Sequence, residues 1–262
     1  MTPPGRPKRF RVALSFPGEL QELDTANRGL GYSNLSQLHL TLGNVPEAVT
    51  AARQSVDFAD RSGEWTQRVG KRTTLADAFH QSGDLAEATR LFSEAERQQA
   101  ENQPECPILY SLPGYRYSDV LLSQGKTAEV VGRASRTLGW GETDGGLLSI
   151  GLNHLSLGRS HPSGSTEAAH HLDRAVDFLH RSGRLDLLPL ALLARGTPHD
   201  FDEVFRIATR SGMRLFLADY HLAKGNLEEA GRLINETGYH RRDRELAALR
   251  AKQAGVWFGF GP

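Results

Sequence analysis

Ten histidines are the residues of this sequence best suited to metal binding or acid–base catalysis, and four of them lie close together in the chain. These four are His154, His161, His170 and His171. Two are adjacent, so on a helix they would point in different directions, and no pair has the His-x-x-x-His spacing with a carboxylate that a zinc enzyme needs. We interpret the histidines as solvated helix residues and predict no metal site.

The sequence also lacks the signature of a nucleophile or of a phosphate-binding loop. Cys106, the single cysteine, lies in QPECPILY between two prolines, with no motif of a thiol enzyme around it, and is interpreted as a loop residue. Residues 139–147, GWGETDGGL, contain four glycines but no Lys-Ser or Lys-Thr pair, so this stretch is interpreted as a linker. We predict no catalytic residue, no cofactor and no enzyme activity.

Charge and composition indicate which classes of partner and which cellular compartment to expect. The 31 Lys and Arg residues are balanced by 31 Asp and Glu residues, so the chain lacks the positive field that attracts nucleic acid. The run HRRDRE, residues 240–245, is diluted by its own acidic residues and is interpreted as part of a solvated last helix. One cysteine is typical of a reducing compartment, which predicts a cytoplasmic protein. No apolar run is long enough for a signal peptide or a membrane span, so neither secretion nor a membrane location is expected.

An internal repeat organises the chain. Four segments align, each with an apolar residue, a small residue beside it, a glycine eight positions after the apolar one, and a small or apolar residue soon after: residues 35–49 (LSQLHLTLGNVPEAV), 75–89 (LADAFHQSGDLAEAT), 117–131 (YSDVLLSQGKTAEVV) and 217–231 (LADYHLAKGNLEEAG). The spacing predicts a helical hairpin in each copy. The apolar residue would lie on the inner stripe of the first helix, the small residues where two helices approach closely, and the glycine where the first helix ends.

Two further hairpins are irregular. Residues 147–158 predict a first helix that stops at Gly158, and after the enlarged turn RSHPSGS a second helix follows in TEAAHHLDRAVDFLH. The next hairpin is predicted in LDLLPLALLARG and FDEVFRIATRSG, where Pro189 is acceptable only near a first turn or at a kink. We therefore expect an all-α solenoid of about six hairpins, each burying its apolar face against its neighbours.

This pattern resembles the tetratricopeptide repeat, which implies a right-handed solenoid that binds proteins or peptides. The spacing of forty between Gly43 and Gly83 is longer than the usual period of that family. The C-terminal stretch RIATRSGMRLFLADYHL, with AGRLINETGYHRRDRELAALR, is similar to the final repeats of arrays in large bacterial signalling proteins of the TIR and STAND classes. These resemblances divide the chain into a tail at 1–20, a helical array at 21–250, whose first helix begins near Arg28, and a tail at 251–262.

The N-terminal segment KRFRVALSFPGE resembles the first strand of a bacterial TIR domain, over about a dozen residues. The rest of such a domain has no room before the first repeat, and the NAD-cleaving glutamate of that family cannot be placed. The sequence therefore leaves two interpretations open. The first is a non-enzymatic interaction module of a bacterial signalling or defence system, with an ordinary N-terminal tail. The second is a truncated regulatory fragment of a TIR-type NAD-consuming protein, inactive alone.

The resemblance also implies which residues would form the concave, partner-binding face. Carried onto this sequence, the family pattern gives Ser33, Gln37, Thr73, Asp77, His80, Tyr115, Asp119, Leu215 and Asp219. The three aspartates occupy one repeated position, which favours a basic or amide-rich peptide. The Lys and Arg pair with which some members of the family clamp a C-terminal carboxylate is missing, since Lys71 and Arg72 stand alone. A clamp of that kind is not expected.

Overall fold

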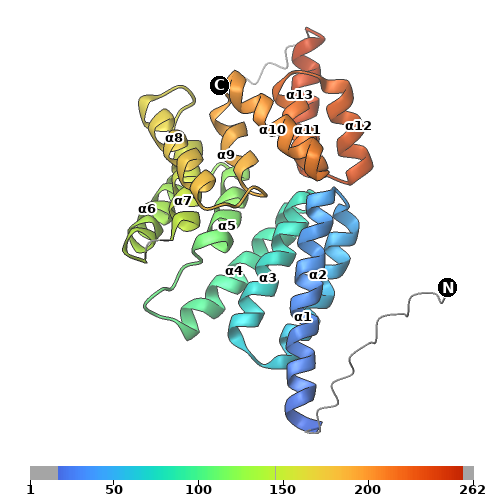
Figure 1. Cartoon of the computed structure of the whole chain (residues 1–262), viewed down its shortest axis with the longest axis vertical. Helices are drawn as coiled ribbons and strands as arrows, with labels where there is room; N and C mark the ends of the chain where they lie inside the picture. The colour runs from blue at the N-terminus through green and yellow to red at the C-terminus, as the bar shows by residue number, and fades with distance from the viewer. Residues whose placement is uncertain (1–16, 145, 256–262) are drawn as a thin grey trace, which may run out of the picture.

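A computed structural model describes residues 17–144 and 146–255, and in this part of the chain the regular elements are helices. Six antiparallel hairpins follow one another (Figure 1). Their helices are α1 (Pro17–Leu42) and α2 (Val45–Ser62), α3 (Trp65–Gln81) and α4 (Leu85–Asn102), α5 (Ser111–Ser123) and α6 (Thr127–Asp144), α7 (Leu147–Ser160) and α8 (Thr166–Arg181), α9 (Leu188–Arg195) and α10 (Pro198–Ser211), and α11 (Arg214–Ala223) and α12 (Leu227–Thr237). A 3-10 turn, η1 (His240–Arg242), and a last helix, α13 (Asp243–Gln253), complete the fold. The prediction of an all-α solenoid of about six hairpins is confirmed.

The repeated residues form the hairpins in the predicted way. Gly43 and Gly83 adopt left-handed conformations with φ of 77° and 88°, and the glycines of the other two copies do the same. The side chain of Asp84 then caps α4 by accepting a hydrogen bond from the backbone N–H of Glu87 at 3.0 Å. The small residues of the four copies are buried, most of them completely: Ser36, Ala76, Ser118 and Ala218 on the first helices, and Ala48, Ala88, Val130 and Ala230 on the second.

The two irregular hairpins differ from the regular ones in length and in how their helices touch. Helix α7 does not stop at Gly158 but continues to Ser160. Gly158 serves close packing instead, because a Cβ atom there would lie 2.7 Å from Cγ of Leu172 on α8. Helix α9 is only 8 residues long, and Pro189 lies in its first turn, as predicted.

The structure differs from the sequence prediction at the end of α6 and at the start of α1. Residues 139–144 are the last turns of α6, so the predicted linker GWGETDGGL is wrong over these residues. Helix α1 begins at Pro17 and not near Arg28, which extends the first hairpin into the predicted tail. Of the segment KRFRVALSFPGE, residues 8–19, the first nine residues lie outside the described residues, as does the tail after residue 255, and the last three begin α1.

The array bends back on itself, so that its two ends meet (Figure 1). Helix α11 contacts α1, and η1 contacts α3. The approach is close: a Cβ atom on Gly43 would lie 2.7 Å from Cγ2 of Thr237, and one on Gly83 would lie 3.2 Å from Cβ of His240. The last hairpin is covered on its outer side by α13, where Leu246 is buried. The first helices of the hairpins therefore surround a central cavity that stays partly open to solvent.

Candidate binding site on the concave face

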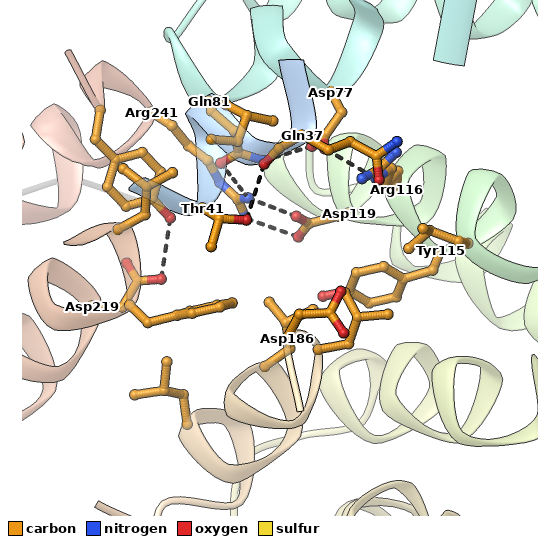
Figure 2. Close-up of a pocket in the computed structure, with 18 of the residues that line it drawn as sticks. Gln37, Thr41, Asp77, Gln81, Tyr115, Arg116, Asp119, Asp186, Asp219 and Arg241 are labelled. Carbon is orange, nitrogen blue, oxygen red and sulfur yellow. Dashed lines mark hydrogen bonds and ion pairs between the residues drawn. The ribbon is translucent and has the colours of Figure 1, made fainter. Parts of the chain in front are cut away.

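The central cavity has a volume of about 360 Å³ and receives side chains from the first helix of every hairpin (Figure 2). Its lining consists of Gln37, Leu40 and Thr41 of α1, Asp77 and Gln81 of α3, Leu112, Tyr115, Arg116 and Asp119 of α5, Arg159 of α7, Leu190, Leu193 and Ala194 of α9, and Leu215, Phe216 and Asp219 of α11, with Arg184, Asp186, Leu187, Tyr239, Arg241 and Arg242 from the connections and η1. The lining combines charged groups with several leucine side chains and Phe216.

The charged side is centred on Asp119, which binds two guanidinium groups. Arg241 approaches it with its two Nη atoms at 2.6 Å and 2.8 Å, and Nη2 of Arg159 lies 2.8 Å from Oδ1 (Figure 2 shows Arg241 pointing at Asp119). The carboxylate is 7% exposed. Burial by itself would raise the pKa of Asp119, but the two arginines hold it well below its usual range. Asp119 is therefore ionised, and one negative charge faces two positive ones.

His80 borders this cluster without adding charge to it. Its ring Nε2 lies 3.0 Å from Oγ of Ser123, and its Nδ1 lies 3.8 Å from Oδ2 of Asp119. Burial, and next the charge of Arg241, lower the pKa of His80 to about 3. The imidazole is neutral at neutral pH, so Arg159, Asp119 and Arg241 together carry a net charge of +1.

Each of the other charged residues of the cavity lining has a partner of opposite charge. Nε of Arg116 lies 3.0 Å from Asp77, and Nη2 of Arg184 lies 2.7 Å from Asp186. Asp219 accepts a hydrogen bond from the hydroxyl of Tyr239 at 3.1 Å, in addition to its ion pair of 2.7 Å with Nε of Arg242. The negative charge of each of these aspartates is therefore balanced by an arginine.

Comparison with known families bears on these hairpins. Residues 29–54 and 72–94 match the family model of the tetratricopeptide repeat, across the turns α1–α2 and α3–α4. The first two hairpins are therefore similar to tetratricopeptide repeats. The remaining hairpins continue the same stacking, which makes the whole array a tetratricopeptide-like solenoid. No curated protein and no solved structure gives a significant match to the chain.

The residues predicted from the tetratricopeptide pattern are brought together only in part. Gln37, Asp77, Tyr115, Asp119, Leu215 and Asp219 line the cavity. Three others are buried and do not line the cavity: the hydroxyl of Ser33 lies 3.3 Å from that of Thr74 on α3, Thr73 donates to the carbonyl of Gly70 within α3, and His80 binds Ser123 on α5. A role of any of these residues in partner binding stays a prediction.

The arginines of the cavity were missed by the sequence reasoning. The run HRRDRE was interpreted as solvated, but the side chains of Arg241 and Arg242 are 11% and 25% exposed and turn into the cavity. Their partners lie on α5 and α11, far away in sequence. The sequence feature that could have revealed these arginines is the aspartate repeated on three of the first helices. A buried carboxylate needs a cationic partner, and the chain has as many cationic as anionic residues.

His154, His171 and Cys106 are not among the residues that line the cavity. His154 is buried, contrary to the expectation of a solvated side chain, and its Nδ1 lies 2.8 Å from Nδ1 of His171. Burial, and next the neighbouring His171, lower the pKa of His154 to about 4, so it is neutral at neutral pH. Cys106 is half-buried in the α4–α5 connection, as predicted. Within residues 17–144 and 146–255, no three His, Cys, Asp or Glu side chains are placed to share a metal ion.

None of the described helices combines the length and the apolar character needed to cross a bilayer.

Proposed function

We propose that this protein is a non-enzymatic module that binds another protein through the outer face of its first hairpin. Tetratricopeptide repeats generally mediate protein–protein interaction, and the observation that supports this surface is an apolar stripe on α1. Of the seven exposed large apolar side chains in the described part of the chain, four lie on this helix: Leu30, Leu35, Leu38 and Leu42. Such clustering on one helix is typical of an interaction surface.

The repeat itself indicates what covers the stripe. Leu35 was predicted on the inner stripe of its helix but is 40% exposed, and Leu38 is 52% exposed. The equivalent residues of the second hairpin, Leu75 and Ala78, are 5% and 0% exposed, because the first hairpin packs against α3. A shallow groove beside the stripe, between α1 and α2, includes Pro46 and Ala51. We infer that the occupant is a helical hairpin of the partner, which extends the stacking of the array by one unit.

Replacing Leu35 and Leu38 together by glutamate tests this surface. We expect the double variant to lose at least about tenfold in affinity for the bound protein, since each buried leucine contributes about 1.5–3 kcal/mol. The partner is first captured with the wild-type chain from a lysate of the source organism and identified by mass spectrometry. Its affinity for each variant is then measured with purified components.

The matched control is Leu185→Glu, which changes a leucine that is 56% exposed and lies on the α8–α9 connection. This variant should bind like the wild type. Both variants should unfold at nearly the wild-type temperature, because exposed positions change stability by only about 0.5 kcal/mol. Equal binding by the wild type and the Leu35→Glu, Leu38→Glu variant would exclude the proposed surface.

The similarity of the C-terminal repeats to those of bacterial signalling arrays supports a role as scaffold or sensor in a bacterial signalling or defence system in the cytoplasm. In that role the first hairpin would hold the protein partner. The cavity residues predicted from the repeat pattern would respond to a second molecule.

A second candidate is a regulatory fragment of a TIR-type NAD-consuming protein, inactive alone. The resemblance of residues 8–19 to a first TIR strand favours it. The two candidates differ in the DNA of the gene and its upstream region. Sequence encoding the missing TIR strands in another reading frame is expected for the fragment, and its absence would leave the scaffold as the better proposal.

A further inference from the structure

We propose that the central cavity binds a small amphipathic anion, in which a carboxylate or a phosphate monoester ends an aliphatic chain. This goes beyond the protein-binding role proposed for the first hairpin, and it rests on different residues. Three features of the cavity carry it: an unbalanced positive charge on one side, an apolar opposite side, and the closure of the array around both.

The positive charge lies where Arg159 and Arg241 share the single carboxylate of Asp119. The side chains of the two arginines are 26% and 11% exposed, so their charge is only weakly screened by solvent. An anion placed between them and the open space of the cavity would offset the excess charge. The planar guanidinium group presents its donors in a fork that matches the oxygen atoms of carboxylates and phosphates.

The other arginines do not supply a competing cationic centre. Arg116 and Arg184 each have their own aspartate, and Arg242 has Asp219. Arg242 also contacts Glu245, whose side chain is 49% exposed and whose charge is therefore screened by solvent at the rim. The head group of the ligand is thus assigned to the cluster around Asp119.

The opposite side of the cavity offers a surface for an aliphatic chain. It consists of Leu187 from the connection before α9, Leu190 and Leu193 from α9, and Leu215 and Phe216 from α11. Figure 2 shows open space between Asp119 with Arg241 on one side and Asp186, in the connection that leads into α9, on the other. A ligand that reaches both sides must carry its charge at one end and its apolar part at the other.

The size of the cavity favours a small molecule over a polypeptide. A volume of about 360 Å³ lies near the lower end of what small-molecule pockets occupy, which is roughly 300–1,000 Å³. The contacts of α11 with α1 and of η1 with α3 close the array around the cavity.

Isothermal titration calorimetry with the whole chain tests the proposal. The probes are octanoate and octyl phosphate, with octyltrimethylammonium and inorganic phosphate as comparisons. We expect at least one of the two octyl anions to bind saturably with a Kd below about 1 mM, and the octyl cation and the chainless phosphate to bind at least about tenfold more weakly. The better of the two octyl anions identifies the head group. Absence of saturable binding by both would overturn the proposal.

The variant Arg159→Met tests the assigned site. It removes the excess charge and leaves Asp119 paired with Arg241, so the fold should be retained, and the affinity for the octyl anion should fall at least about tenfold. The control Arg206→Met makes the same change in net charge at a side chain that is 66% exposed, and should bind like the wild type. If Arg159→Met does not fold, Leu190→Trp fills the apolar side and should abolish binding in its place. Undiminished binding by the folded variant would refute the site.

Discussion

Replacing Asp119 by alanine is expected to lower the free energy of unfolding by about 3–5 kcal/mol, because the change leaves two mostly buried guanidinium groups without their carboxylate. Arg241 and Arg159 both bind this side chain in the wall of the cavity. Loss of the carboxylate would also remove the contact between η1 and α5 that helps to hold the ends of the array together. Denaturant unfolding followed by circular dichroism measures the difference.

The control for this prediction is an ion pair at the surface. Asp243 contacts His240 at 3.1 Å, but both side chains are more than half exposed. Asp243→Ala should therefore change the free energy of unfolding by less than about 0.5–1 kcal/mol. Combining Asp119→Ala with Arg241→Met should cost less than the sum of the two single changes, since the second removes a charge that the first left unpaired. An Asp119→Ala variant as stable as the Asp243→Ala variant would contradict the described network.

Replacing Gly43 by alanine should be almost as damaging, at about 2–5 kcal/mol. The residue has φ of 77°, which costs a non-glycine residue about 1–2 kcal/mol, and its new Cβ atom would lie 2.7 Å from Thr237 and 2.8 Å from Arg214. Overpacking of this kind adds about 1–3 kcal/mol. The collision falls where the first turn of the array meets α11 and α12, so the closure of the array should weaken together with its stability.

Gly63 provides a matched comparison. It ends α2 with φ of 75°, but a Cβ atom there would meet no atom within 4 Å. Gly63→Ala should therefore cost only the backbone strain of about 1–2 kcal/mol. Hydrogen exchange then separates the two effects: the amides of α11 and α12 should exchange faster in Gly43→Ala than in Gly63→Ala. Equal losses of stability in the two variants would show that the ends of the array do not meet.

The sequence alone was sufficient for the hairpins because their determinants are local. A glycine that ends a helix in a left-handed conformation, such as Gly83, and a small residue that lets two helices approach, such as Ala76, act within about forty residues of one another. The same spacing recurs in four copies, which made the number of hairpins and the buried small positions predictable. Where local signals conflicted, as at Gly158, the packing of α7 on α8 decided the helix end.

The sequence also identified six side chains of the cavity, including Asp77 and Asp119, because a repeated position points to the same face of each first helix. The environment predicted for the aspartates was wrong, because they are paired with arginines. Whether a carboxylate is free or paired depends on residues that approach from elsewhere, and Arg241 lies 122 positions from Asp119.

Only the tertiary structure decided that the array closes, that its concave face is a small cavity, and that Arg241 turns into it. Curvature adds up over many hairpin contacts, each of which fixes a small rotation, and no short pattern in the sequence encodes their sum. The exposure of Leu35 has the same origin. Its residue type follows the repeat, but its burial depends on whether another hairpin packs before it, which is a property of position in the stack.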